Sequence, residues 1–109
     1  LLIGGGGDGM VYTFDMRAGA KPSGQAMLFP RGCVCDFDVS GPTAVVSGAR
    51  SQLNPFGENE FVFDSRMCAL DLRSMRVASE VFFAPGAAAV RWWPGSASTI
   101  VAASAEGTL

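Results

Sequence analysis

The stretch GDGMVYTFDMR, residues 7–17, joins an Asp-Gly pair to an alternating apolar run that ends in Asp-x-Arg. Glycines in this position can form a phosphate-binding loop or a turn between two strands. A phosphate loop needs its glycines to open a helix, because the N-terminal amides of the helix hold the anion. Here strand-forming residues follow Gly9, and no Lys-Ser/Thr pair follows the glycines. The stretch therefore predicts a tight turn at Asp8-Gly9 between two antiparallel strands, since Gly accepts a positive φ at little cost.

Strand signals dominate the rest of the chain. Short runs of β-forming residues alternate with turn residues about every ten positions. No stretch shows a convincing helical period over three turns. The sequence therefore predicts an all-β protein with strands at residues 10–14, 25–29, 33–39, 43–47, 67–72, 77–83, 89–93 and 99–104.

Parts of this pattern repeat along the chain. Asp15-x-Arg17 recurs as Asp71-x-Arg73, and the strand that ends at Gly41 parallels the strand that ends at Gly95. The polar segment 51–60 reads as a loop inserted between strands. Without that segment the repeating unit is about 45 residues long, which is within the range of WD40 repeats. The fold expected is a WD40-like β-propeller fragment of about two and a half blades, each blade being a four-stranded antiparallel sheet.

The turns also predict where the blades begin and end. Residues 1–29 would be the end of one blade, residues 33–83 a full blade with the insertion at 51–60, and residues 86–109 the start of the next. A closed propeller needs at least four blades, so the chain is expected to be part of a longer propeller. The structural turn and strand-end residues in this scheme are Asp8, Gly9, Asp15, Asp38, Gly41, Asp71 and Arg73.

Composition argues against several kinds of site. The net charge is -2, and no apolar run approaches 18 residues, so neither nucleic-acid binding by charge alone nor a membrane helix is expected. The absence of histidine removes Ser-His-Asp and Cys-His catalysis and the usual zinc sites. The spacing of Cys33, Cys35 and Cys68 matches no common zinc motif. An odd number of cysteines without a secretory signal indicates reduced thiols, as in the cytosol or nucleus. This segment is expected to have no catalytic residue, no cofactor and no small-molecule substrate.

Two acidic and two aromatic residues allow a functional and a structural interpretation. Asp36 and Asp38 point to one face of their strand and could hold a metal, but hydrogen bonds to a neighbouring turn amide are favoured. Trp92 and Trp93 could stack on bases. Because adjacent strand residues point to opposite faces, one ring is expected in the core and the other at a blade interface or on the surface.

The arginines and the inserted segment are the remaining candidates. Arg73, Arg76 and Arg91 could contact phosphate, although Arg73 is expected to pair with Asp71 or a turn carbonyl. Insertions carry function more often than blade strands do, so the segment from residue 51 to 61 is the main candidate surface. The partner-binding residues predicted there are Phe56, Glu58 and Phe61, with packing of both rings back onto the blade as the alternative.

The second half of the chain resembles a known family. The stretches CDFDVSGPTAVVSGAR and CALDLRSMRVASEVFFAPGAAAVRWWPGSASTIVAASAEG, with an Asn-Pro-Phe loop between them, are similar to the WD40 domain of the catalytic subunit of the poly(A)-nuclease (Pan) deadenylation complex. The resemblance covers residues 33–105, while the first 30 residues match only as a generic blade. The matching residues are Asp36, Asp38, Val39, Ser40, Gly41, Asp71, Leu72, Arg73, Met75, Arg76, Pro85, Arg91, Trp92 and Pro94.

The resemblance implies a role for the whole protein. The propeller would be a non-catalytic protein-interaction scaffold in front of a pseudo-ubiquitin-hydrolase domain and a DEDD-class 3′-exonuclease, which would shorten mRNA poly(A) tails with two Mg²⁺ ions. The implied partners are the regulatory Pan subunit and poly(A)-bound protein, and the implied location is the cytoplasm, including P-bodies. Direct contact with RNA is left open. The alternatives are a WD40 scaffold of an unrelated cytosolic or nuclear complex and a propeller enzyme that acts through its central channel.

Overall fold

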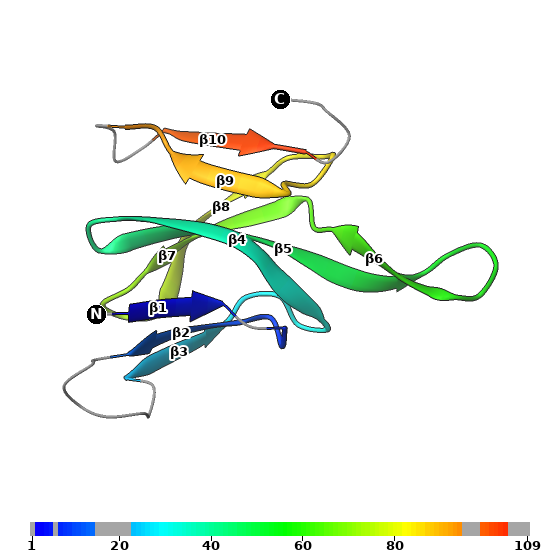
Figure 1. Ribbon diagram of the computed structural model, residues 1–109, viewed down its shortest axis with the longest axis horizontal. Helices are drawn as coiled ribbons and strands as arrows, with labels where there is room; N and C mark the ends of the chain where they lie inside the picture. The colour runs from blue at the N-terminus through cyan, green and yellow to red at the C-terminus, as the bar shows by residue number, and fades with distance from the viewer. Residues whose placement is uncertain (1, 6, 15–22, 95–98, 105–109) are drawn as a thin grey trace.

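The computed structural model describes residues 2–5, 7–14, 23–94 and 99–104. These residues form three antiparallel sheets that lie one above another (Figure 1). The described residues contain no helix, and hence none with the length and hydropathy to cross a membrane. The prediction of an all-β chain is therefore confirmed for the part of the chain that the structure describes.

The sheets follow one another along the chain. The first has the order β1-β2-β3, the central one the order β4-β5-β7-β8 with β6 paired to the far half of β5, and the third consists of β9 and β10. The strands are β1 (Leu2–Gly5), β2 (Met10–Phe14), β3 (Gly24–Met27), β4 (Gly32–Ser40), β5 (Thr43–Leu53), β6 (Asn59–Phe63), β7 (Arg66–Asp71), β8 (Arg76–Phe82), β9 (Ala89–Trp92) and β10 (Ile100–Ala103).

The glycine-rich start forms the predicted turn. β1 and β2 pair as antiparallel strands, and Gly9 between them has a φ of 78°. The Gly9 carbonyl accepts hydrogen bonds from the N–H groups of Leu28 (3.0 Å) and Phe29 (3.1 Å). A strand, not a helix, therefore follows the glycines, and no helix N-terminus is formed there to hold a phosphate.

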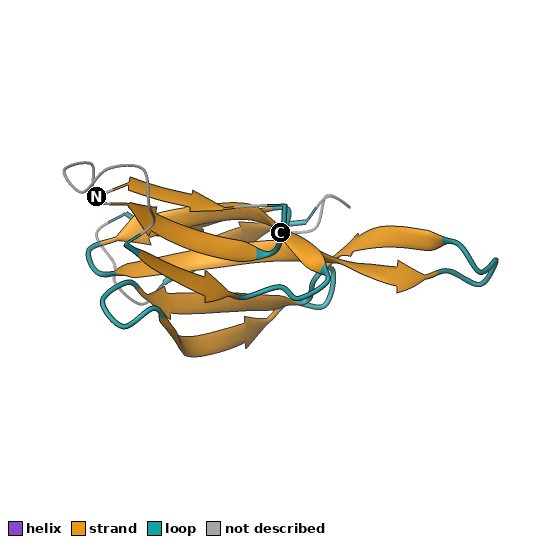
Figure 2. Ribbon diagram, turned by 90° about the horizontal axis from the view of Figure 1, so that it is seen from below, coloured by secondary structure: helices purple, strands orange, loops and turns teal. Residues whose placement is uncertain are grey.

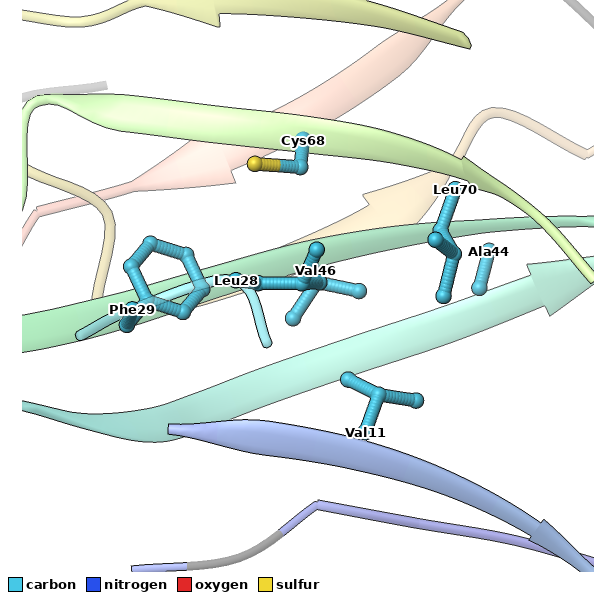
Figure 3. Packing of buried hydrophobic residues seen from close by; sticks show 7 residues of the cluster. All are labelled: Val11, Leu28, Phe29, Ala44, Val46, Cys68 and Leu70. Atoms are coloured by element: carbon cyan, nitrogen blue, oxygen red, sulfur yellow. The ribbon is translucent and has the colours of Figure 1, made fainter. Parts of the chain in front are cut away.

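The central sheet has apolar residues on both of its faces. On one face Ala44 and Val46 of β5 pack with Leu70 of β7 against the first sheet (Figure 3). On the other face Val45 packs with Met67 and Val90 against the third sheet, in a second apolar cluster. This alternation arises because successive residues of a strand point to opposite faces. β5 is consequently buried without interruption from Ala44 to Ala49.

β8 is the strand of the central sheet that faces solvent. All seven of its residues are exposed, and it lies at the end of the order β4-β5-β7-β8. The sheet is thus buried through β5 and open along its last strand. This is the arrangement expected of a propeller blade, whose outer strand meets water.

The prediction of a loop at residues 51–60 is wrong. Ser51–Leu53 continue β5, and β6 pairs with them from Leu53↔Asn59 to Ala49↔Phe63. The hairpin projects away from the stacked sheets, at the right of Figure 2. The polar residues of this segment resemble a loop, but they continue β5, which is already hydrogen-bonded to its neighbouring strands. Only residues 54–58 form the turn of the hairpin. We call the hairpin from Ser51 to Phe63 the arm.

The remaining predicted strands all have counterparts: the strand at residues 10–14 has its predicted bounds, and the others have shifted ends. β3 ends at Met27, two residues before its predicted end, because the N–H groups of Leu28 and Phe29 are directed to Gly9. β6 was not predicted at all. Asp15 lies outside the described residues, so the first Asp-x-Arg strand end is without a structural description.

Replacement of Gly48 by Ala should destabilise the protein. A Cβ atom built on Gly48 would lie 2.5 Å from two ring carbons of Phe29 and 2.7 Å from the Cys33 carbonyl oxygen. We expect Gly48→Ala to lower the free energy of unfolding by about 1–3 kcal/mol, as for other overpacked cores. The measurement is unfolding of the full-length protein in urea, monitored by tryptophan fluorescence.

Gly4→Ala is the matched control for this prediction. Gly4 also lies in a strand, but a Cβ atom there would meet nothing within 4 Å. Its substitution should change the free energy of unfolding by less than about 0.5 kcal/mol. Equal effects of the two substitutions would contradict the packing of Phe29 on Gly48.

Candidate protein-interaction site

The arm carries the residues that the sequence nominates as a binding surface. Phe56 lies in the turn with 87% of its surface exposed, and Phe61 lies in β6 with 69% exposed. Glu58 is exposed at the end of the turn. The alternative in which both rings pack back onto the blade is therefore wrong, and two aromatic rings stand in solvent on one projecting hairpin.

The turn of the arm is closed by one side chain. The side-chain oxygen of Asn54 accepts hydrogen bonds from the N–H groups of Phe56 and Glu58, each at 3.0 Å. The Asn54 N–H donates to the Glu58 carbonyl oxygen at 2.8 Å, and Gly57 has a φ of 78°. Asn side chains commonly hold turns in this way. Phe56 is thus presented on a hydrogen-bonded backbone.

A groove of about 700 Å³ lies at the root of the arm. Phe61, Val62 and Phe63 of β6 line it, together with Ala84 and Pro85, which follow β8. The side chains of Arg50 and Gln52 on β5 complete the lining. The groove therefore combines an apolar wall with polar groups.

Asp36 and Asp38 join the central sheet to the third sheet. Asp36 Oδ2 accepts hydrogen bonds from the Val90 N–H (2.9 Å) and from Arg91 Nη1 (2.5 Å). Asp38 Oδ2 accepts from the Trp92 N–H (2.8 Å), and the Asp38 carbonyl accepts from the indole N–H of Trp92 (3.1 Å). We call this set of contacts the β4–β9 clasp.

The clasp gives both carboxylates of the acidic pair a structural role. Both carboxylates are hydrogen-bonded to β9, and among the described residues no group of three or more His, Cys, Asp or Glu could hold a metal. The expectation that a turn amide would be the donor is wrong, since the amides belong to a strand. Asp36 and Val90, like Asp38 and Trp92, are 54 positions apart, so the clasp joins two equivalent strands of the repeat.

Trp92, Gly41 and Asp71 have structural roles. Trp92 is half-buried and packs in the second apolar cluster while Trp93 is exposed, as predicted. Gly41 has a φ of 58° in the turn between β4 and β5. Asp71 Oδ1 accepts from the backbone N–H of Arg73 at 2.9 Å. The contact therefore runs through the main chain of Arg73, and in the described part of the chain no ion pair joins the two side chains.

Arg66 is a linking residue that the sequence analysis missed. Its guanidinium lies 5.4 Å from the centre of the Phe29 ring, donates to the Leu28 carbonyl oxygen, and pairs with Glu80 Oε1 at 3.0 Å. It thus connects β7 to the segment after β3 and to β8. Nothing in the local sequence signals this role, because Arg66 and Leu28 are far apart in the chain.

Neighbouring groups and burial shift the pKa values of Asp8 and Cys35. The hydrogen bonds from the Tyr12 hydroxyl and the Met10 N–H lower the pKa of Asp8 below its usual value, at the turn between β1 and β2. Desolvation, followed by the neighbouring Cys33 and Asp36, raises the pKa of Cys35 to about 11. A thiol with such a pKa is protonated at neutral pH and is a poor nucleophile and metal ligand.

Comparison with solved structures identifies the fold. The chain is similar to the WD40 domain of Pan2 from Neurospora crassa, with a TM-score of 0.74, 22% sequence identity, and coverage of 94% of this chain and 30% of that chain. No family model matches the sequence, and a search of curated proteins finds no match. The predicted fold class is confirmed: the three sheets are part of a WD40-like β-propeller.

Loss of the Asp38 carboxylate should weaken the contact between the sheets. We expect Asp38→Ala to lower the free energy of unfolding by about 1.5–3 kcal/mol, because a charge-assisted bond to the Trp92 N–H is lost. Asp71→Ala is the control, since within the described residues its carboxylate accepts a hydrogen bond only from an exposed N–H two residues away. Urea unfolding with tryptophan emission measures both variants, and a larger loss for Asp71→Ala would contradict the clasp.

Cys35 should react slowly with iodoacetamide at pH 8. Raising the thiol pKa from 9.0 to about 11 lowers the thiolate population about 100-fold, and the greater nucleophilicity of the more basic thiolate restores about tenfold. We therefore expect alkylation about tenfold slower than in the same protein unfolded in urea. Fragment-ion mass spectrometry distinguishes Cys35 from Cys33. Equal rates in the folded and unfolded protein would show that the fold does not perturb this thiol.

Proposed function

We propose that this chain is part of the WD40 propeller of a Pan2-like deadenylase subunit, where it acts as a non-catalytic protein-interaction scaffold. The observation that carries the proposal is the structural similarity to the Pan2 WD40 domain over 94% of the chain. The Asp-x-Asp-Val-Ser-Gly and Asp-Leu-Arg stretches of the central sheet support it, since they are the residues on which the sequence resemblance rests. The chain spans 30% of that solved chain, so the activity of the whole protein is part of the proposal.

The geometry supports a scaffold role in two ways. The apolar faces and the β4–β9 clasp hold the sheets in a fixed arrangement, so surface residues are presented on a rigid support. The arm then offers Phe56 and Phe61 as exposed aromatic anchors, and buried aromatics supply much of the energy of protein interfaces. The partners proposed are the regulatory Pan subunit and poly(A)-bound protein, in the cytoplasm.

The proposal is tested by purification of the tagged protein from its own cells. Co-purified proteins are identified by mass spectrometry, and the eluate is incubated with a 3′-polyadenylated RNA in the presence of Mg²⁺. We expect the regulatory Pan subunit in the eluate and trimming that is confined to the A tail. Chelation of Mg²⁺ by EDTA should abolish the trimming, because a two-metal nuclease needs both ions.

An RNA that ends in a non-A tail is the control for specificity. Recovery of other partners with an intact poly(A) tail would overturn the deadenylase assignment. The protein would then be a WD40 scaffold of another complex, whose function would follow from the partners recovered.

A further inference from the structure

The outer edge of β6 has no partner strand in the described structure. β6 pairs with the far half of β5, as β7 pairs with its near half, and β8 continues the sheet beyond β7 only. β8 ends at Phe82, where it lies opposite Arg66 at the start of β7. The segment after β8 reaches the Phe63 end of β6, where a Cβ atom built on Gly86 would lie 2.7 Å from the Phe63 carbonyl oxygen. Beside Asn59 and Phe61, in contrast, no described strand occupies the position that pairs with the outer edge of β6.

The hydrogen bonds of the arm determine which backbone groups face this position. The Asp64 N–H donates to the Gly48 carbonyl oxygen at 2.8 Å, and the Asn54 N–H donates to that of Glu58 at 2.8 Å. Backbone groups of an antiparallel strand alternate between facing the partner and facing away. The N–H and C=O groups of Asn59 and Phe61 are thus directed away from β5, toward the empty position.

Successive side chains of β6 point to opposite faces of the arm, and the two faces differ in chemistry. Phe61 and Phe63 lie on one face of the arm, and Glu60 and Val62 lie on the other. The groove at the root of the arm runs beside the same strand, with Ala84 and Pro85 on its other side. An added strand would consequently place alternate side chains against the aromatic rings and against Glu60.

Charge determines what such a strand would carry. Glu58 and Glu60 are exposed, and no cation pairs with either of them among the residues that the structure describes. Arg50 also lines the groove and lies on the same face of the arm as Glu60, but it belongs to β5 and is one strand farther from the empty position than Glu60. A second copy of the arm would bring like charges together, which is unfavourable for directly opposed residues. A basic side chain opposite Glu60 is complementary.

We propose that the free edge of β6 binds an extended segment of a partner protein by strand addition, and that this segment alternates apolar residues with Lys or Arg. Main-chain hydrogen bonds to Phe61 would supply affinity, while Phe61, Phe63 and Glu60 would select the side chains. The inference rests on the proposed scaffold role of the arm. It does not depend on which complex the protein belongs to.

The test is a selection of random dodecapeptides displayed on phage, with the gene-encoded protein as bait. Enriched peptides should alternate apolar and basic residues. An enriched peptide is then synthesised and its Kd is measured against variants of the protein. Phe61→Ala and Glu60→Lys in the protein should each raise this Kd about tenfold or more. Trp93→Ala is the matched control, because Trp93 is an aromatic residue that is 56% exposed and follows β9 in the third sheet, and it should change Kd less than about twofold.

N-methylation of the peptide tests strand addition itself. Methyl groups on the amides that face β6 should abolish binding, whereas methyl groups on the intervening amides should leave it intact. Binding that tolerates both sets, an acidic consensus, or no enrichment that depends on Phe61 would overturn the inference. Thermal unfolding checks that Phe61→Ala and Glu60→Lys remain folded, as expected for exposed positions.

The two proposals fail separately. Peptide selection requires neither the regulatory Pan subunit nor RNA, so a failed poly(A) assay with an arm-dependent basic consensus overturns only the proposed complex. Successful poly(A) trimming without arm-dependent peptide binding overturns only the strand-addition inference.

Discussion

Burial of β5 on both faces is the constraint on which the rest of the structure depends. Ala44 and Val46 require one apolar sheet against them, and Val45 requires another, so the neighbouring sheets must stack on opposite sides of the central one. Apolar faces alone would tolerate sliding, since hydrophobic burial has no direction. Asp36 and Asp38 remove that freedom, because each accepts a directed bond from one backbone amide of β9. The outer strand and the arm are among the surfaces that this packing leaves exposed.

Features that depend on neighbouring residues could be predicted from the sequence. The turn at Gly9 could be identified from two local features. Glycine accepts the positive φ that the turn requires, and strand-forming residues follow it. The alternation around Val45 and the opposite directions of Trp92 and Trp93 follow from the two-residue period of a strand. The repeat spacing indicated the propeller because each blade reuses one pattern.

Features that depend on distant contacts could not be predicted. The spacing between Asp38 and Trp92 was visible as a repeat, but the bond between their strands requires knowledge of how blades stack. Arg66 contacts a carbonyl 38 positions away, and no local pattern encodes that distance. The polar residues of the arm suggested a loop, because the local sequence does not show that Ser51 pairs with Phe61 as a continuation of β5. Exposure of Phe56 likewise follows from the projection of the hairpin.

The register of the β5–β6 hairpin limits which insertions the arm can accept in evolution without a change in the face that its side chains occupy. Residues inserted at the turn in pairs, one for each strand, would lengthen the hairpin and leave Phe61 and Phe63 on their present face. A single residue inserted in β6 between Phe61 and Phe63 would instead turn Phe61 to the opposite face and bring Glu60 to the aromatic side. Lineages can therefore vary the reach of the arm freely, while odd-numbered insertions in β6 would be selected against wherever its pattern of side chains is read by another molecule.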